Sequence, residues 1–252
     1  MSPLTHRQLP WHPRITIVEP FAPDLQVEGL AVAIDVLRAF SNLAYLFVEK
    51  GLKDATIVSD FDVMQRLRGN FSSHLLMGEK EGRVPTDFAA GNSPSRSLNP
   101  AFNVVGQSAL LSTSAGTVGL LRALEQGANP VLTGSFVNIT STLRYIQQIK
   151  PPVITLIACG NSARERAIED ILFAGYLRDL IEGRQPTLSI DEIREQCRSD
   201  RFNSRFFDPV QAECYPQADF DLCFQDRMAV VIRAESQTVS GIAVAHLEPL
   251  FI

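Results

Sequence analysis

The chain has 252 residues, of which 45% are hydrophobic and 20% charged, so it is long enough and apolar enough to fold around a sizeable core. Its formal net charge of −5 and the lack of a basic stripe argue against nucleic-acid binding, because phosphate contacts need a basic face. No apolar stretch approaches the ~20 residues that cross a bilayer, the N-terminus lacks the apolar core of a secretory signal, and the cysteines form no Cys-x-x-Cys pair. We therefore expect a cytoplasmic, reduced protein with no membrane partner and no structural zinc.

Short apolar runs alternate along the chain with segments of helical periodicity. After a polar arm over residues 1–13, the predicted strands are Arg14–Val18, Leu30–Asp35, Ala55–Val58, Ala109–Thr113, Val131–Gly134 and Val153–Ala158. The predicted helices are Val36–Lys50, Asp62–Arg68, Val118–Gln126, Asn138–Ile149 and Ala163–Glu182. Strands that alternate with helices predict a sheet with parallel strands.

Two parts of the chain depart from this alternation. Residues 69–108 show little periodicity, which predicts either a long excursion with a functional role or an ordinary irregular loop over the sheet. Beyond about residue 184 the segments are polar and basic, and the last strand candidates, expected as hairpins at one edge of the sheet, are Leu222–Phe224, Met228–Arg233 and Gly241–Ala245. We expect a single domain over residues 1–252, with a three-layer α/β/α architecture around a largely parallel or mixed sheet.

Four of the predicted strands end in small polar loops, at Asp35 and at residues 112–117, 134–138 and 159–162. Ligands of open α/β sheets bind outside the carboxyl ends of the strands. Backbone amides at helix N-termini, with hydroxyl groups beside them, suit an anion. The four loops therefore predict one site for a small anionic substrate at that edge of the sheet.

Two acidic positions could serve this site. Asp35 follows an apolar strand, where it either caps the next helix or serves a metal or catalysis. Glu79 and Glu81 flank Lys80 in a glycine-bounded loop, a pattern that suits either Mg²⁺ or a solvated turn. Arg38, one helical turn after Asp35, either pairs with it, grips an anion or lies on the surface.

Glu169 and Asp170 are adjacent in the otherwise apolar stretch Ala167–Leu177. Because adjacent helical residues diverge by about 100°, at most one of them need face inward. Cys159 follows an apolar strand, and it is either a nucleophile at a helix N-terminus or a small buried residue. The turn over residues 112–117 is either an anion site or a plain helix cap, and Asn92 and Ser93 alone are typical of a turn before proline.

Together these segments resemble the 2-phosphosulfolactate phosphatase (ComB-like) family. The matching pieces are Ala33–Ala39, Gly78–Glu79, Gly91–Pro94, Thr113 with Gly116–Thr117, Gly134–Asn138, and Glu169–Asp170 with Ala174–Gly175. The resemblance runs from about residue 28 to about residue 180, with a weaker echo at Ala218–Val231. It implies an α/β fold, Mg²⁺ dependence and hydrolysis of the phosphate monoester of a sulfonated hydroxy acid on the route to coenzyme M.

The residue patterns and the resemblance together assign candidate roles. The candidate metal ligands are Asp35, Glu79 and Asp170. The candidate catalytic residues are Asp35, Arg38, Cys159, Glu169 and Asp170. The candidate substrate contacts are Asn92, Ser93, Thr113, Ser114, Gly116, Thr117, Ser135 and Asn138.

The chain also departs from the family pattern. The family's hydroxyl turn usually reads Thr-Thr-Asn-Gly-Thr, and here Ala115 stands at the asparagine. The family's Gly-Glu-Arg-Gly-Gly has Lys80 at the arginine, and lysine lacks the bidentate fork. The segment Cys159-Gly160-Asn161 likewise differs from the family's usual Cys-Ala-Gly.

Two hypotheses follow. The first is a Mg²⁺-dependent phosphatase of a small acidic phosphomonoester, which converts 2-phospho-3-sulfolactate to 3-sulfolactate and phosphate. Its expected nucleophile is a water on the metal, with Ser114 or Cys159 as covalent alternatives. The second is a catalytically weakened relative that binds a phosphorylated or sulfonated metabolite. The sequence leaves open whether the chain forms a homo-oligomer.

Overall fold

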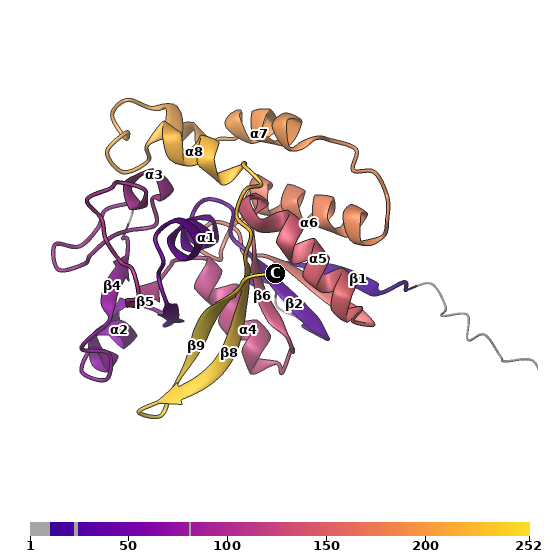
Figure 1. Cartoon of the computed structure of the whole chain (residues 1–252). Helices are drawn as coiled ribbons and strands as arrows, with labels where there is room; N and C mark the ends of the chain where they lie inside the picture. Colours follow the sequence, from indigo (N-terminus) through magenta and orange to yellow (C-terminus); the bar gives the residue numbers. More distant parts are fainter. Residues whose placement is uncertain (1–10, 23–24, 81) are drawn as a thin grey trace, which may run out of the picture.

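The computed structural model describes residues 11–22, 25–80 and 82–252. Most of the predicted N-terminal arm, and Glu81, lie outside the described residues. Within the described parts, one mixed sheet is flanked by helices on both faces (Figure 1), which confirms the predicted three-layer α/β/α class. None of the described helices is long and apolar enough to span a membrane.

The sheet consists of two groups of parallel strands joined by a hairpin. In the described residues its strands are β1 (Arg14–Val18), β2 (Leu30–Ile34), β3 (Asp54–Ile57), β4 (Leu75–Gly78), β5 (Ser108–Ser112), β6 (Val131–Gly134), β7 (Val153–Ala158), β8 (Val231–Val239) and β9 (Ile242–Leu250). Their order is β1-β7-β2-β6-β8-β9-β3-β5-β4. Strands β1, β7, β2 and β6 are parallel, as are β3, β5 and β4, while β8 is antiparallel to β6 and β9 to β3.

The C-terminal hairpin lies in the middle of the sheet, so its predicted place at an edge is wrong (Figure 1). The first half of β8, including Ile232 and Ala234, is buried between neighbours, whereas residues 235–238 are exposed. The apolar half of β8 thus has the burial of a central strand, whereas the polar half extends past the end of β6 and is paired only with β9. A short apolar run in the sequence carries no signal of which strand it will pair with.

The helices of the described residues are α1 (Ala39–Glu49), α2 (Phe61–Leu67), α3 (Pro94–Ser97), α4 (Gly116–Glu125), α5 (Ile139–Ile149), α6 (Ile168–Ile181), α7 (Ile190–Arg198) and α8 (Gln217–Cys223), with short 3₁₀ turns η1 (Phe136–Asn138) and η2 (Asn203–Phe207). Two further predictions are wrong. Residues 69–108 contain β4 and α3, and Leu222–Phe224 ends a helix instead of forming a strand. Phe220, Cys223 and Phe224 recur at helical spacing and pack into one core, which accounts for the helix.

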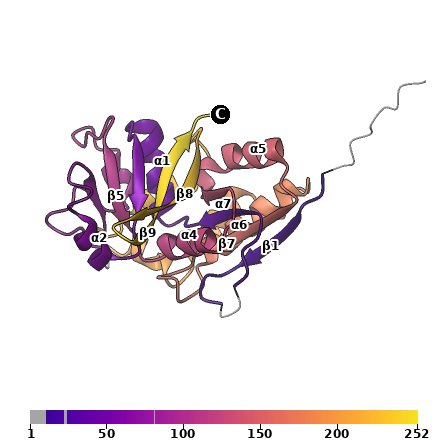
Figure 2. The same ribbon diagram turned by 90° about the horizontal axis from the view of Figure 1, so that it is seen from below.

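The two faces of β2 explain the layers. Ala31 and Ala33 face a core that includes residues of α1 and α4. Leu30, Val32 and Ile34 face a second core, built with residues of α5 and α6. Helices α5 and α4 accordingly lie on different sides of the sheet when it is seen from below (Figure 2).

The carboxyl ends of β2 and β5 meet even though the hydrogen-bonding pattern makes these strands antiparallel. The contact is direct, because the Asp35 carboxylate accepts a hydrogen bond from the amide of Gly116. Neighbouring strands are rotated by about 20–25°, so the five steps from β2 to β5 turn the strand direction by roughly 100–125°. The twist therefore brings loops from both parallel groups to one place.

Candidate active site

A cavity of about 510 Å³ opens where these loops meet. Three of the four predicted strand-end loops line it, namely those after β2, β5 and β7, and the loops after β3 and β4 add to the wall. The wall residues that bear on its chemistry are Asp35, Arg38, Asp60, Glu79, Lys80, Asn92, Ser112, Thr113, Ser114, Ala115, Gly160, Asn161, Ser162, Arg205 and Tyr215. The cavity is thus a polar pocket at the carboxyl ends of the strands, where the sequence placed a site.

Asp35 ties two helix N-termini together. Its Oδ1 accepts a hydrogen bond from the amide of Ala39, 3.2 Å away, at the start of α1. Its Oδ2 accepts one from the amide of Gly116, 3.1 Å away, at the start of α4. Asp35 therefore acts as a cap for two helices while it also lines the cavity.

Asp170 holds two further loops from behind. Its Oδ1 accepts from the Val36 amide and its Oδ2 from the Gly160 amide, each at 2.9 Å. Its neighbour Glu169 is also buried, and Glu169 Oε2 accepts from Asn203 Nδ2 at 3.0 Å. Both acids of this pair face inward, so the expectation that one of them is on the surface is wrong; each is accommodated by its own hydrogen-bond donors.

Burial makes these carboxylates easier to protonate. It raises the pKa of Asp35 to about 6, although the amides of Ala39 and Gly116 favour the charged form. Burial, and then the negative charges of Glu169 and Asp35, raise the pKa of Asp170 well above its ordinary value. Burial likewise raises the pKa of Glu169, against the effect of Asn203. Three buried acidic side chains therefore lie at or behind the cavity. Their hydrogen-bond donors among the described residues are neutral groups, namely backbone amides and the Asn203 side chain.

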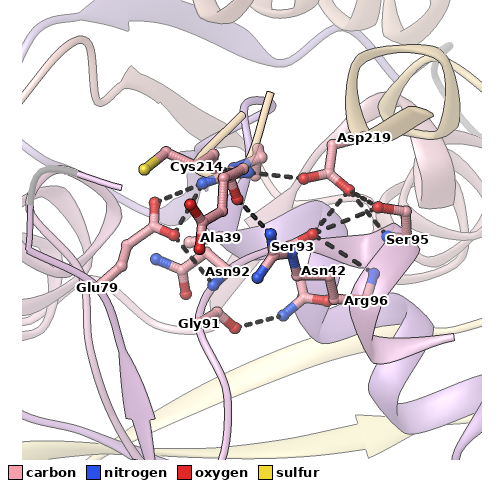
Figure 3. Close-up of polar contacts among 12 residues, drawn as sticks. Ala39, Asn42, Glu79, Gly91, Asn92, Ser93, Ser95, Arg96, Cys214 and Asp219 are labelled. Carbon is pink, nitrogen blue, oxygen red and sulfur yellow. Dashed lines mark hydrogen bonds and ion pairs between the residues drawn. The ribbon is translucent and has the colours of Figure 1, made fainter. Parts of the chain in front are cut away.

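Arg38 is held by two carboxylates. Its Nη2 donates to both oxygens of Glu79 at 2.8 Å, and its Nη1 donates to Asp219 Oδ2 at 2.6 Å and to the Cys214 carbonyl at 3.0 Å. Only 2% of the Arg38 side chain is exposed. Figure 3 shows Glu79 and Asp219 at two sides of this cluster, with Cys214 between them. Burial opposes the charge of Arg38, but the two carboxylates outweigh it and raise the pKa of the guanidinium.

Asp219 also binds the turn at Asn92-Ser93-Pro94 and so accounts for the position of Ser93. Its Oδ1 accepts from the Ser93 hydroxyl at 2.9 Å, and from both the amide and the hydroxyl of Ser95 at 2.8 and 2.6 Å (Figure 3). Ser93 therefore binds a carboxylate of the protein itself. Asn92 lines the cavity, and its Oδ1 is buried with no hydrogen-bond partner among the described residues.

The hydroxyl turn after β5 has an inner and an outer part. Thr113 and Thr117 bond to each other through their hydroxyls and amides, and Thr117 is buried. Ser114 and Ala115 line the cavity, and their amides donate to no group in the described parts of the chain. The outer part is thus the portion of this turn that can bind an anion.

Eight of the sequence-predicted site residues do not line the cavity. Ser93, Gly116, Thr117, Glu169 and Asp170 are among them, and each bonds to other groups of the protein, as described above. The other three are Ser135, Asn138 and Cys159. Ser135 and Asn138 are buried and bond to each other, and Asn138 also donates to the Val230 carbonyl at the start of the hairpin. Cys159 is buried in a core, and burial raises the pKa of its thiol well above the ordinary value. A buried neutral thiol is a poor nucleophile, which favours the interpretation of Cys159 as a small core residue.

Comparison with known proteins agrees with this geometry. The profile of the 2-phosphosulpholactate phosphatase family matches residues 15–202. A probable 2-phosphosulfolactate phosphatase of Caldicellulosiruptor saccharolyticus is 31% identical over 173 residues, which are 68% of this chain and 69% of that protein. One of Bacillus subtilis is 26% identical over 196 residues, 77% of this chain and 82% of that one. The chain belongs to the 2-phosphosulpholactate phosphatase family.

The resemblance to this family implied Mg²⁺, so the question is whether the residues at the cavity could hold a metal ion. Among the described residues, no three acidic, histidine or cysteine side chains form a group that could hold a metal. In particular, Glu79 is bound to Arg38 and is not gathered with Asp35 and Asp170. Asp35 nevertheless lines the cavity together with the unpartnered Asn92 Oδ1, and Asp170 lies behind it. Such oxygen donors suit Mg²⁺, which needs only one or two carboxylates.

Sequence reasoning overlooked Asp219, Arg205 and Tyr215 of this family member. Arg205 and Tyr215 line the cavity, and Asp219 anchors Arg38. Asp219 falls within the weak echo at Ala218–Val231, which was a usable signal. Arg205 and Tyr215 lie beyond the family match, in a segment whose sequence showed only polar and basic residues and no motif.

Proposed function

We propose that this chain hydrolyses a small acidic phosphomonoester, and that 2-phospho-3-sulfolactate is its substrate, with 3-sulfolactate and phosphate as products. One observation carries the proposal. In a member of this family, the loops after several strands form a single polar cavity that contains Asp35 and the outer part of the hydroxyl turn. In the hydrolysis, water adds to phosphorus, the bond from phosphorus to the ester oxygen breaks, and that oxygen leaves with a proton.

The cavity residues divide this work. The amides and hydroxyl near Ser114 and Ala115 bind phosphoryl oxygens and offset the charge that develops on them. Asp35 brings its negative charge to the cavity wall, where it can hold a cation, although burial raises its pKa to about 6 when none is bound. Arg38 lies in the cavity wall, but its guanidinium is already bound to Glu79 and Asp219. Its role is therefore to position Glu79 and not to bind the ester. Ser114, which is exposed in the cavity, remains the covalent alternative for the nucleophile.

We also propose that Mg²⁺ binds here, held by Asp35 at the cavity wall with Asn92 Oδ1 as a further oxygen donor, while Asp170 adds negative charge from behind the wall. When bound, the ion supplies Lewis-acid polarisation of the phosphoryl group. The concentration of buried acidic groups supports this, since a divalent cation would relieve their mutual repulsion.

The test is phosphate release from 2-phospho-3-sulfolactate by metal-stripped protein, with and without added Mg²⁺. We expect turnover only with Mg²⁺, and loss of at least about a hundredfold in kcat for Asp35→Asn. Calorimetric titration with Mg²⁺ alone should show binding to the wild type and none to Asp35→Asn. Absence of turnover over a panel of acidic phosphomonoesters at several pH values would refute the phosphatase proposal.

The second candidate, a binding protein with weakened catalysis, is favoured by Ala115 and Lys80, which line the cavity at positions where the family pattern has asparagine and arginine. Binding of the ester without turnover would select it. The double variant Lys80→Arg, Ala115→Asn should then gain activity, because it restores an amide group and a guanidinium fork.

A further inference from the structure

The C-terminal segment adds a cationic group to the cavity. Arg205, from η2, and Tyr215, just before α8, both line it. The Arg205 guanidinium carbon lies 4.5 Å from the centroid of the Tyr215 ring and 5.5 Å from that of Phe206. The ring of Tyr215 is in turn backed by Gly82, where an added Cβ would lie 2.7 Å from its Cζ. Arg205 thus rests on an aromatic platform that is itself packed in place.

Two guanidinium groups lie beside this tyrosine ring, and they differ in charge compensation. Arg38, 5.0 Å from the ring centroid, is neutralised by Glu79 and Asp219. Nearby Arg198 and Arg201 have carboxylate partners, whereas Arg205 forms no ion pair with any described carboxylate. Its charge acts only from a distance on the buried Glu169, whose pKa it lowers. The Arg205 Nε is buried and donates no hydrogen bond to any of them. An arginine in this state, at a cavity wall, is an incomplete anion site.

We propose that Arg205 binds the second acidic group of the substrate, the sulfonate or carboxylate, while the loop after β5 binds the phosphoryl group. The inference rests on the proposed function and adds to it the residue that selects for a polyanionic ester. A planar fork pairs with two oxygens of a sulfonate or carboxylate, and its stacking on Tyr215 reduces the entropy lost on binding. Arg205 lies beyond the matched residues 15–202, so this part of specificity comes from the chain's own C-terminal segment.

The test compares three esters with one carbon skeleton: isopropyl phosphate, 2-phospholactate, which adds a carboxylate, and 2-phospho-3-sulfolactate, which adds a sulfonate as well. For Arg205→Gln we expect KM to rise at least tenfold for the ester that carries all three acidic groups, with kcat within twofold. KM for isopropyl phosphate should stay within twofold, and Arg205→Lys should recover part of the loss. The matched control is Arg201→Gln, since Arg201 also stacks on a neighbouring ring, at 4.3 Å from Phe202, but pairs with Glu165 outside the cavity wall.

A second measurement needs no turnover. Calorimetry with 3-sulfolactate, which lacks phosphate, should give a Kd at least tenfold weaker for Arg205→Gln than for the wild type. Equal losses on all three esters, or equal Kd values for the two proteins, would overturn the inference. If the wild type hydrolyses none of the esters, the proposed function fails, and the 3-sulfolactate titration alone decides the role of Arg205.

Discussion

At the scale of single residues, the site is organised by side chains that bind the protein itself. Asp35 and Asp170 use all four carboxylate oxygens on backbone amides of the loops. Arg38 is enclosed by Glu79 and Asp219. These groups hold the loops at fixed spacing, and that spacing defines the cavity. In the proposals made above, substrate binding falls to groups at the surface of the cavity, such as Ser114 and Arg205.

The Arg38 cluster provides the first prediction. Arg38→Gln leaves the Glu79 and Asp219 carboxylates without their counter-charge, and the free energy of unfolding should fall by roughly 3–5 kcal/mol. The control is Arg68→Gln, whose ion pair with Asp87 is 50% and 45% exposed and should matter by less than about 1 kcal/mol. Urea denaturation of both variants checks this. Similar losses in the two variants would contradict the assigned role.

The raised pKa of Asp35 predicts a stability that depends on pH. The folded pKa of about 6 exceeds the ordinary aspartate pKa of 3.8, so the folded state binds more protons between these values. The contribution of Asp35 is therefore most favourable below about pH 4 and is lost as the pH rises through 6. In chelator, the stability of Asp35→Asn relative to wild type should rise between pH 4 and pH 7, by on the order of 3 kcal/mol at most. A difference that does not change with pH would show that Asp35 titrates normally.

At the scale of elements, the loops after β2 and β5 approach each other so closely at Gly116 that a side chain there would block the contact. At Gly116, the first residue of α4, an added Cβ would lie 2.8 Å from both Asp35 Oδ2 and Phe40 Cζ. The close approach allows the Gly116 amide to reach Asp35, and so it joins the loops of the two parallel groups. The glycine in the sequence motif therefore has a packing reason in addition to any contact with an anion.

Gly116→Ala tests this reading. We expect loss of about 1–3 kcal/mol in stability from overpacking, together with loss of at least tenfold in phosphatase activity because the loop after β5 is displaced. The control is Gly175→Ala in α6, where nothing lies within 4 Å of the added Cβ. That change should stabilise the protein by roughly 0.5–1 kcal/mol, because alanine loses less backbone entropy in a helix. Full activity in Gly116→Ala would rule out the proposed strain.

At the scale of the whole molecule, the C-terminal hairpin joins the two groups of parallel strands into one sheet. Strands β8 and β9 lie between β6 and β3, and the described residues show no direct pairing between the two parallel groups. Asn138 and Ser135 fasten the start of this hairpin instead of lining the cavity. The site, which draws on loops from both groups, thus depends on residues about a hundred positions away in the sequence.

A truncated chain tests this dependence. Ending the chain at Ala229 exposes the paired edges of β6 and β3 and removes Ile232 and Leu247 from the core. We expect no cooperative unfolding transition for this variant by circular dichroism. Removing only Phe251 and Ile252, which are exposed and follow β9, should leave the transition unchanged. A folded product from the longer truncation would refute the joining role of the hairpin.

The sequence by itself determined the features that depend on neighbours in the chain. Apolar runs predicted β1, β2, β6 and β7, and helical periodicity predicted the helices that follow the last three of these strands. The polar loops at strand ends located the cavity. Local patterns also identified Asp35, Arg38 and Glu79, because an ionisable residue beside an apolar run or glycine stands out.

Only the tertiary structure decided which of these groups meet. It turned Arg38 and Glu79 toward each other, buried both Glu169 and Asp170, and moved Ser135 and Asn138 out of the site. It placed the hairpin in the centre of the sheet. It also brought Arg205 and Tyr215 to the cavity, and Asp219 to Arg38, from the far end of the chain. The physical reason is that strand pairing, sheet twist and charge compensation join residues distant in sequence, and no local pattern records their partners.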